Sequence, residues 1–251
     1  MTLHVHQFPC LSDNYGYLVR DEASGQVASI DSPDADAILR ELNRLGWTLD
    51  RILNTHWHPD HAGGNERLKA ETGCEIVGPP EVTRIAPLDQ PVGEGDVVEL
   101  GATRFEVLDT GGHTLGHISY WDQADGVVFV GDTMFALGCG KVFEGTYAQM
   151  WSSLSKLAAL PDETLVYCAH EYTASNARFA LSVDDSPQLK ARAEQVFAAR
   201  QRGEPTVPTR IGAEKAANPF LRAPQLKIGR AAGAGAEAFA AVRQAKDAFK
   251  G

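Results

Sequence analysis

Short apolar runs separated by turn residues fill the first two thirds of the chain. Runs of four to eight residues that concentrate or alternate apolar side chains, and that end at Gly, Pro, Asn, Asp or Ser, are typical of β-strands. This pattern predicts strands at residues 3–8, 15–21, 27–32, 50–55, 74–78, 96–100, 103–110, 117–122, 126–132 and 164–170.

Three segments between these strands have the spacing of a helix instead. In residues 34–46 apolar positions recur every three to four residues, and Gly46 stands where a helix is expected to end. Residues 65–73 and 146–160 are also predicted to be helical, and Pro161 ends the second of them. Many strands with helices between them indicate a layered α/β or α+β domain.

The strand pattern stops near Ala169. Residues 186–203 and 235–250 are predicted as amphipathic helices, joined by a connector rich in Pro, Thr and Gly. We therefore expect two domains, a layered one of residues 1–170 and a helical one of residues 171–251.

Composition is that of an ordinary globular protein. The 251 residues are 43% hydrophobic and 22% charged, and no apolar run approaches the ~20 residues of a membrane helix. The first residues lack the basic and apolar regions of a secretory signal, so we expect a cytoplasmic protein. We also expect a monomer without a membrane partner. The four cysteines form no C-x-x-C pair, which argues against a zinc ribbon and a disulfide framework and predicts small buried side chains.

Charge is uneven along the chain. The formal net charge of −10 disfavours nucleic-acid binding, which needs a basic surface. Residues 1–170 hold 10 Lys and Arg against 25 Asp and Glu, whereas residues 171–251 hold 13 against 8. An acidic first part is suited to divalent cations and a basic tail to an anionic ligand, although an uneven surface without function would give the same counts.

The densest group of titratable residues lies in the segment LNTHWHPDHAGGN. His56 and His58 are two residues apart, so on a helix they would point about 200° apart, whereas on an extended segment both imidazoles lie on one side. Asp60 and His61 follow where the chain turns toward the next predicted helix. Imidazoles and carboxylates are ligands of Zn²⁺, and Fe and Mn are also possible. Because one ion could hardly collect four ligands from so short a loop, we expect two neighbouring sites.

Three further polar residues follow predicted strands in the same way. His113, Asp132 and His170 each come directly after an apolar run, and strand ends on one edge of a sheet can converge. Taken singly, each of these histidines is more often a hydrogen-bonded residue, and the aspartate is more often a turn residue. With the loop they make seven candidate ligands, enough for four per ion if Asp132 bridges: His56, His58, Asp60, His61, His113, Asp132 and His170. The remaining histidines are expected to be non-ligands, in strands or beside the ligands: His4, His6 and His117.

The chain resembles the glyoxalase II (hydroxyacylglutathione hydrolase) family of the metallo-β-lactamase-fold hydrolases in the segments THWHPDHAGG, GGHTLGH, FVGDTMFALGCGKVFEGT and CAHEYTASN, in this order. The similarity runs nearly end to end and includes NPFLR and RQAKDAF in the tail. It implies an α+β protein, an αββα sandwich followed by a helical substrate-binding domain. It also implies a binuclear metal centre with Asp132 bridging, in which His56, His58 and His113 bind one ion and Asp60, His61 and His170 bind the other.

The activity that the resemblance implies is hydrolysis of the thioester S-D-lactoylglutathione to D-lactate and glutathione, the second step of methylglyoxal detoxification. The nucleophile would be a hydroxide held by the two ions, Zn²⁺ in the first instance, and Asp60 would orient it. The resemblance further implies that Lys141, Tyr172, Arg243 and Lys246 contact glutathione.

Phe143 departs from some relatives, which have tyrosine there, so one hydroxyl contact to glutathione should be missing. In the tail, Arg243, Lys246 and Lys250 are spaced to share one helix face. Without the resemblance, such a basic stripe would be read as solvated surface.

Rival functions share only part of this pattern. A persulfide dioxygenase on the same fold would use one iron, and the complete second set of ligands argues against it. A β-lactamase or a tRNA-processing nuclease would share the histidine loop but not the GCGK segment or the basic pair of the tail. A metal-binding regulatory or scaffold protein would not need an open two-metal site.

Overall fold

A computed structural model describes residues 2–251 of the chain. Contacts between residues divide it into two compact units, Met1–Asp109 with Gly116–Gly131, and Thr110–Leu115 with Asp132–Gly251. This division into units differs from the domain boundary at residue 170 that the sequence predicted. The boundary at residue 170 stays a prediction.

The first unit contains ten strands in two groups. The first group, in the order β1 to β6, comprises β1 (Leu3–Cys10), β2 (Asn14–Asp21), β3 (Val27–Ile30), β4 (Arg51–Leu53), β5 (Glu75–Gly78) and β6 (Gln90–Pro91). Its first three strands are antiparallel, and β3 to β6 pair in parallel. The second group is an antiparallel meander of β7 (Val97–Leu100), β8 (Thr103–Asp109), β9 (Ile118–Asp122) and β10 (Val127–Gly131).

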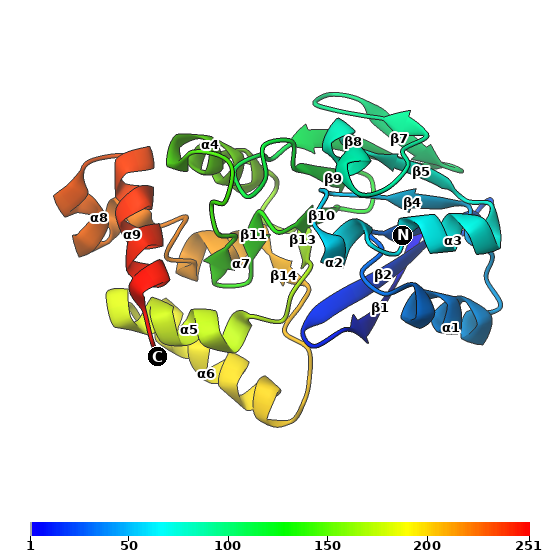
Figure 1. Cartoon of the computed structure of the whole chain (residues 1–251). Helices are drawn as coiled ribbons and strands as arrows, with labels where there is room; N and C mark the ends of the chain where they lie inside the picture. The colour runs from blue at the N-terminus through cyan, green and yellow to red at the C-terminus, as the bar shows by residue number, and fades with distance from the viewer. Residues whose placement is uncertain (1) are drawn as a thin grey trace. The chain divides into compact units, whose positions relative to one another are not determined.

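The helices of the first unit are α1 (Ala35–Leu45), the one-turn α2 (Pro59–Ala62), α3 (Asn65–Thr72) and a 3₁₀ turn, η1 (Pro80–Arg84). Two of them, α1 and α3, lie where the sequence predicted helices, whereas the short α2 and η1 were not predicted. The Asp34 side chain caps α1 by accepting from Ala37 N–H at 3.1 Å, and Gly46 ends it with φ 68°, which glycine adopts without a steric penalty. In Figure 1, α1 and α3 lie near the blue and cyan strands, and Ile38 and Leu68 belong to one core with residues of these strands.

Aromatic side chains join the two groups of strands. Tyr17 on β2 contacts Phe129 on β10 at a ring-centroid distance of 5.7 Å, and Phe105 on β8 contacts the same ring at 6.2 Å. These rings are almost completely buried, so they form a core between the strand groups. The sheets thereby hold their strand ends, and the loops that follow them, in fixed positions.

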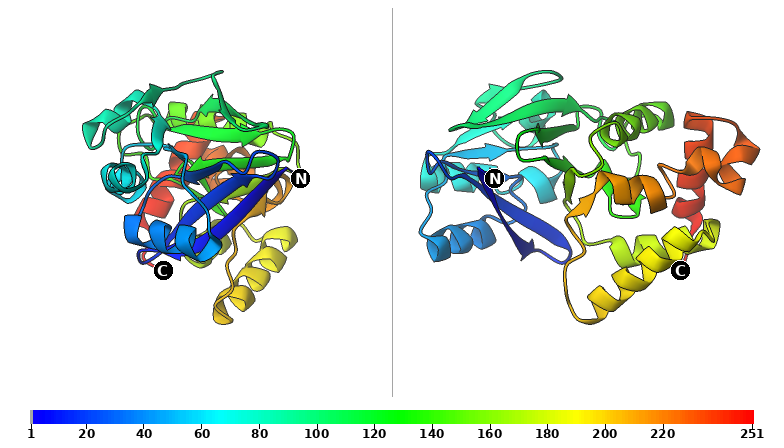
Figure 2. Two further views of the ribbon diagram at one scale, coloured as in Figure 1. Left: turned by 90° about the vertical axis from the view of Figure 1, so that its right-hand side faces the viewer. Right: turned by 180° about the vertical axis from the view of Figure 1, so that it is seen from behind.

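The second unit is mainly helical. It contains β11 (Met134–Phe135), β12 (Gly138–Cys139), α4 (Tyr147–Ala158), β13 (Leu165–Cys168), α5 (Thr173–Val183), α6 (Pro187–Gln201), β14 (Thr209–Arg210), α7 (Ile211–Ala217), the 3₁₀ turn η2 (Ala223–Gln225), α8 (Lys227–Ala232) and α9 (Ala236–Ala248). Helices α5 and α6 pack together, as do α8 and α9 (Figure 2). The expectation that strands end near residue 169 is wrong in one place, because the two-residue β14 pairs with β13.

The structure bears on two predictions made from composition, the burial of the cysteines and the lack of a membrane-spanning helix. The four cysteines are buried, as predicted. Among residues 2–251, no helix has both the length and the apolar character to cross a membrane.

Candidate metal centre

The loop after β4 supplies four of the seven candidate ligands. His58 has an extended backbone, and Pro59, whose fixed φ suits the first position of a helix, then begins α2. Within this turn the His61 N–H donates to the His58 carbonyl at 2.9 Å. The chain therefore changes from extended to helical between the His56/His58 pair and the Asp60/His61 pair.

His56 and His58 point at a common position. His56 Nε2 lies 3.1 Å from His58 Nδ1. Two nitrogens bound to one tetrahedral ion at the usual Zn–N length would be about 3.3 Å apart. The spacing of this pair is therefore that of two ligands of one ion.

Asp31, which was not among the expected site residues, lies at the end of β3 and fixes two of the histidines. Its carboxylate accepts from the Thr55 N–H at 2.7 Å and hydroxyl at 2.8 Å, and from His61 Nδ1 at 2.8 Å. Because the Thr55 hydroxyl donates to Asp31, its oxygen accepts from His56 Nδ1 at 3.0 Å. Nδ1 of His56 and of His61 therefore holds the proton, which leaves each Nε2 lone pair for a metal.

A sequence signal for Asp31 existed. It ends the apolar run VASI just as Asp132 ends the run VVFVG. Its backbone has φ 57°, a left-handed conformation that aspartate tolerates better than most residues.

A buried amide network holds the backbone of His61. Its carbonyl accepts from Asn54 Nδ2 at 3.0 Å and from Ser32 N–H at 2.7 Å. Asn65 completes the network by donating to Asn54 Oδ1 at 2.6 Å and accepting from the Ser32 hydroxyl at 2.5 Å. Asn54, Ser32 and Asn65 are fully buried, so the network fixes α2 against β3 and β4.

Asp60 is partly exposed, with 40% of its side chain accessible. Asn14 Nδ2 donates to its backbone carbonyl at 3.3 Å and to its Oδ2 at 3.4 Å. The same Oδ2 lies 3.8 Å from His61 Nε2. The carboxylate thus lies beside the lone pair that Asp31 leaves on His61.

Gly63 and Gly64, at the end of the histidine loop, allow a close approach of backbone segments that a side chain would prevent. A Cβ at Gly63 would meet the Pro59 carbonyl oxygen at 2.3 Å, and one at Gly64 would meet the Ser32 carbonyl oxygen at 2.7 Å. Both contacts are with backbone atoms, which cannot move aside. A side chain at Gly63 would therefore distort α2, and one at Gly64 would push the end of the loop away from Ser32.

His113 is oriented by a backbone carbonyl. Its Nδ1 lies 2.8 Å from the Lys141 carbonyl oxygen, which can only accept, so Nδ1 holds the proton. Nε2 of His113 is then the ligand atom, and it lies 3.4 Å from Asp132 Oδ2.

Asp132 lies between two imidazoles. Its Oδ2 is 3.4 Å from His113 Nε2, and its Oδ1 is 3.4 Å from His170 Nε2. Both separations match ligand atoms that share an ion, about 3.3 Å for a tetrahedral site. Each oxygen of this carboxylate thus faces a different histidine, which is the geometry of a bridging ligand.

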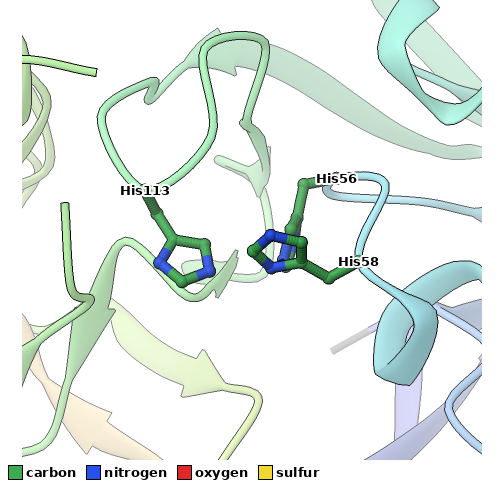
Figure 3. Close-up of side chains that lie close together, drawn as sticks. All are labelled: His56, His58 and His113. Carbon is green, nitrogen blue, oxygen red and sulfur yellow. The ribbon is translucent and has the colours of Figure 1, made fainter. Parts of the chain in front are cut away.

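Three groups of side chains offer ligand atoms within 4.8 Å of one another. Figure 3 shows the first, in which the rings of His56, His58 and His113 face a common space. The other two are His56 with His61 and Asp132, and Asp60 with His61 and His170. A His/Asp cluster of this composition fits a site for two metal ions.

The histidines expected to be non-ligands belong to none of these groups. His4 and His6 are on β1, and His6 Nε2 lies 2.8 Å from Glu41 Oε2. His117 is buried and stacks on His56, with ring centroids 4.8 Å apart. It belongs to none of the three groups.

Three of the side chains expected to contact substrate lie beside the candidate ligands His113 and His170. The Tyr172 ring stacks on His170 at 4.7 Å between centroids, and Phe143 meets His113 edge-on at 5.2 Å. Lys141 Nζ lies 5.2 Å from the centre of the Phe143 ring. Phe143 is 60% exposed and Tyr172 38% exposed, so both rings are accessible.

The basic residues of the tail differ in exposure. Arg243 is buried and donates to the Cys139 carbonyl at 3.0 Å and to Asp247 at 2.9 Å. Lys246 is partly buried, with Nζ 3.4 Å from the Ser175 carbonyl. Burial lowers the pKa of Lys246, and the nearby charge of Arg243 lowers it further. The expectation that Lys250 shares their helix face is wrong, because α9 ends at Ala248.

Two family models match consecutive parts of the chain. Residues 21–170 match the metallo-beta-lactamase superfamily, and residues 171–249 match the hydroxyacylglutathione hydrolase C-terminus.

Relatives resemble the chain over nearly its full length. A hydroxyacylglutathione hydrolase of Maricaulis maris is 55% identical, over 98% of this chain and 99% of that protein. Another, from Erythrobacter litoralis, is 51% identical over 98% and 100%. The crystal structure of ETHE1 from Myxococcus xanthus has a TM-score of 0.70 at 31% identity, over 96% of this chain and 90% of that one.

Proposed function

Because the chain belongs to the hydroxyacylglutathione hydrolases of the metallo-β-lactamase superfamily, we propose that it hydrolyses S-2-hydroxyacylglutathione thioesters, S-D-lactoylglutathione in particular. The protein is a metal-dependent hydrolase. Its α+β, metallo-β-lactamase-like fold with a helical C-terminal region confirms the fold predicted from the sequence.

One observation supports the substrate above all. The match to curated hydroxyacylglutathione hydrolases extends through the C-terminal region that the second family model describes. A hydrolase that shared only the metal site would match only the first model. We accordingly propose that residues 1–170 form the catalytic domain and residues 171–251 the domain that holds glutathione.

These side chains fit two divalent ions, Zn²⁺ in the first instance, because neighbouring ligand atoms are separated as two atoms bound to the same ion would be. When bound, such ions lower the pKa of water to about 7 and polarise a carbonyl group. The proposed partition gives one ion His56, His58 and His113 and the other Asp60, His61 and His170, with Asp132 shared.

Residues of the chain prepare this site before substrate arrives. Asp31 and the Lys141 carbonyl fix the Nδ1 protons of His61 and His113, so no proton has to move when a ligand bond forms. Asp60, beside His61 and partly open to solvent, is proposed to orient the attacking water as well as to bind metal.

Glutathione binding is proposed for five residues: Lys141, Phe143, Tyr172, Arg243 and Lys246. A phenylalanine at position 143 supplies a ring but no hydroxyl, so this contact is apolar. Loss of one hydrogen bond typically costs about 0.5–1.5 kcal/mol, which would weaken glutathione binding without abolishing it. Phe143 beside His113 and Tyr172 beside His170 would hold the thioester next to the metals.

The remaining expectations stay predictions. They are a monomer, a cytoplasmic location and the absence of a nucleic-acid partner. The persulfide dioxygenase alternative is not favoured, because the curated relatives named here are hydroxyacylglutathione hydrolases at about 50% identity over nearly the full chain.

The activity is tested by pairing a metal count with an assay. Elemental analysis of the purified protein should give about two metal ions per chain, and the thioester absorbance of S-D-lactoylglutathione should fall on addition of enzyme. The chelator-stripped protein, before and after metal is returned, is the control. Two bound metals without thioester loss would contradict the proposal, and one iron with oxygen uptake on glutathione persulfide would support the dioxygenase.

A further inference from the structure

The segment Phe135–Lys141, which we call the β11–β12 segment, is held by side chains of three helices. From α5, Asn176 Nδ2 donates to the Ala136 carbonyl at 3.2 Å. From the residue that directly follows α7, Asn218 Nδ2 donates to the Phe135 carbonyl at 3.2 Å and to the Gly138 carbonyl at 2.9 Å. From α9, Arg243 donates to the Cys139 carbonyl at 3.0 Å. Helices of the C-terminal region thus fix the backbone of this segment along its length.

The far end of the β11–β12 segment touches two proposed metal ligands. The Lys141 carbonyl accepts the Nδ1 proton of His113 at 2.8 Å. Gly140 N–H donates to the Thr133 carbonyl at 3.2 Å, and a Cβ on Gly140 would lie 1.9 Å from the Asp132 carbonyl oxygen. A shift of this segment would therefore move the acceptor that fixes His113 and press on the backbone of Asp132.

Among the bonds that Asn176, Asn218 and Arg243 make to this segment, the bond of Arg243 is the nearest to Lys141 in sequence. Cys139, its acceptor, is two residues from Lys141. The guanidinium is itself fixed, since it is 5% exposed, pairs with Asp247 at 2.9 Å and lies 5.0 Å from the centre of the Phe220 ring. A buried guanidinium held on several sides is suited to fix a backbone carbonyl, because its planar group has donors in set directions.

We propose that Arg243 is a positioning residue of the metal centre, which holds the Cys139 carbonyl and thereby keeps the Lys141 carbonyl in place as the hydrogen-bond acceptor of His113. This inference rests on the proposed role of His113 and Asp132 as metal ligands. It assigns Arg243 a task beyond substrate binding and distinguishes it from Lys246, one helical turn further along α9.

The physical consequence is a weaker metal site when the guanidinium is lost. Without its bond to Arg243, the segment from Cys139 to Lys141 is less constrained, and the Nδ1 proton of His113 loses a fixed acceptor. Partners of metal-binding histidines typically affect metal affinity or activity by about 10–100-fold when they are changed. We expect an effect of this size on the ion that His113 binds.

The test compares Arg243→Met with two other variants of the metal-loaded full chain. Metal affinity is measured by competition with a chromophoric chelator, which requires no substrate. In the cobalt-loaded protein, proton NMR also reports the exchangeable Nδ1 protons of the ligand histidines. Arg222→Met is the matched control, because Arg222 is also largely buried and its guanidinium bonds Asp184 and Ser186 instead of the β11–β12 segment. Lys246→Ala removes a cation from the same helix.

Arg243→Met should lower the affinity for one metal ion by about 10–100-fold and shift or remove one exchangeable histidine signal. Arg243→Lys, which keeps a donor, should restore part of both. Arg222→Met and Lys246→Ala should keep the wild-type metal affinity, and circular dichroism of all variants should show retained folding. Wild-type metal affinity and an unchanged NMR spectrum in Arg243→Met would overturn the proposal. Failure of the thioester assay in the wild type would instead count against the proposed function, because the metal measurements do not depend on it.

Discussion

A hydrogen bond at Nδ1 decides whether a histidine can bind metal through Nε2. His61 donates to Asp31 and His113 donates to the Lys141 carbonyl, and neither acceptor has a proton to give back. A change that turned either acceptor into a donor would move the histidine proton to Nε2. The imidazole would remain in place but would no longer be a ligand.

Asp31→Asn tests this argument at one residue. The amide keeps the shape of the carboxylate but presents an NH₂ group to His61 or to Thr55, so at least one histidine should change tautomer. We expect about a 10–100-fold loss of metal affinity, measured by chelator competition, with the fold retained. Asp21→Asn, the same substitution at a buried aspartate whose side chain bonds Ser24 and Thr103, is the control. Unchanged metal affinity in Asp31→Asn would show that the Asp31 carboxylate does not set the tautomer.

At the scale of the element, α9 presents two cations to different surroundings. Arg243 is buried against the β11–β12 segment, whereas Lys246 is partly buried and lies near Ser175. The partly accessible cation is the better candidate for an anionic group of glutathione. We therefore propose that Lys246 binds glutathione, whereas Arg243 also has the positioning role described above.

Lys246→Ala should raise the KM for S-D-lactoylglutathione about tenfold or more and leave kcat nearly unchanged. The reason is that a charged hydrogen bond to a remote part of the substrate, about 1.5–3 kcal/mol, is lost equally from the ground and transition states. Steady-state kinetics measure both constants. Lys250→Ala, beyond the end of α9, is the control and should keep the wild-type KM. A fall in kcat without a change in KM would refute the binding role.

Local patterns predicted helices α1, α3, α4, α6 and α9 and most of the longer strands, but they did not predict helices α2, α5, α7 and α8 or the two-residue strands. Strand ends placed His56, His113 and Asp132 because a strand and the residue after it are continuous in sequence. The end of α9 was not predicted, since the apolar and basic spacing continues to Lys250. In the structure the Phe249 ring contacts Phe179 on α5, at 5.5 Å between centroids, and its backbone is extended. That contact depends on residues 70 positions apart, which no local pattern contains.

At the scale of the whole molecule, the residues that orient the ligands were the hardest to predict. Asp31 and its partner His61 are separated by 30 residues, and Arg243 and Cys139 by 104. The candidate metal ligands themselves are of residue types that indicate metal binding. An arginine that bonds a carbonyl, or an aspartate at a strand end, has many structural roles, and only the folded chain distinguishes them.

Asp21 links distant parts of the first unit and makes stability depend on pH. It accepts from Ser24 at 2.7 Å and from Thr103, 82 residues away, at 3.0 Å. Burial raises the pKa of Asp21, but these hydrogen bonds outweigh it and lower the pKa to about 2. An aspartate in the unfolded chain titrates near 3.9, so this carboxylate contributes stability above about pH 4, and the contribution is lost as the pH falls toward 2.

Asp21→Asn should therefore lower the free energy of unfolding at neutral pH and reduce its decline on acidification. Urea unfolding between neutral pH and about pH 3 gives both quantities. Asp162→Asn, at an exposed ion pair with Lys215, is the control and should keep the wild-type pH profile. A wild-type profile in Asp21→Asn would show that its hydrogen bonds do not stabilise the folded state.

The four buried cysteines have a consequence for a protein that handles thioesters. Burial raises the pKa of Cys139 to about 11 and that of Cys168 to about 12. Near neutral pH these thiols are almost entirely protonated, and only a thiolate attacks a thioester carbonyl at a useful rate. The acyl group of a glutathione thioester therefore meets almost no cysteine thiolate to which it could be transferred. Self-acylation is suppressed, and water is left as the acceptor.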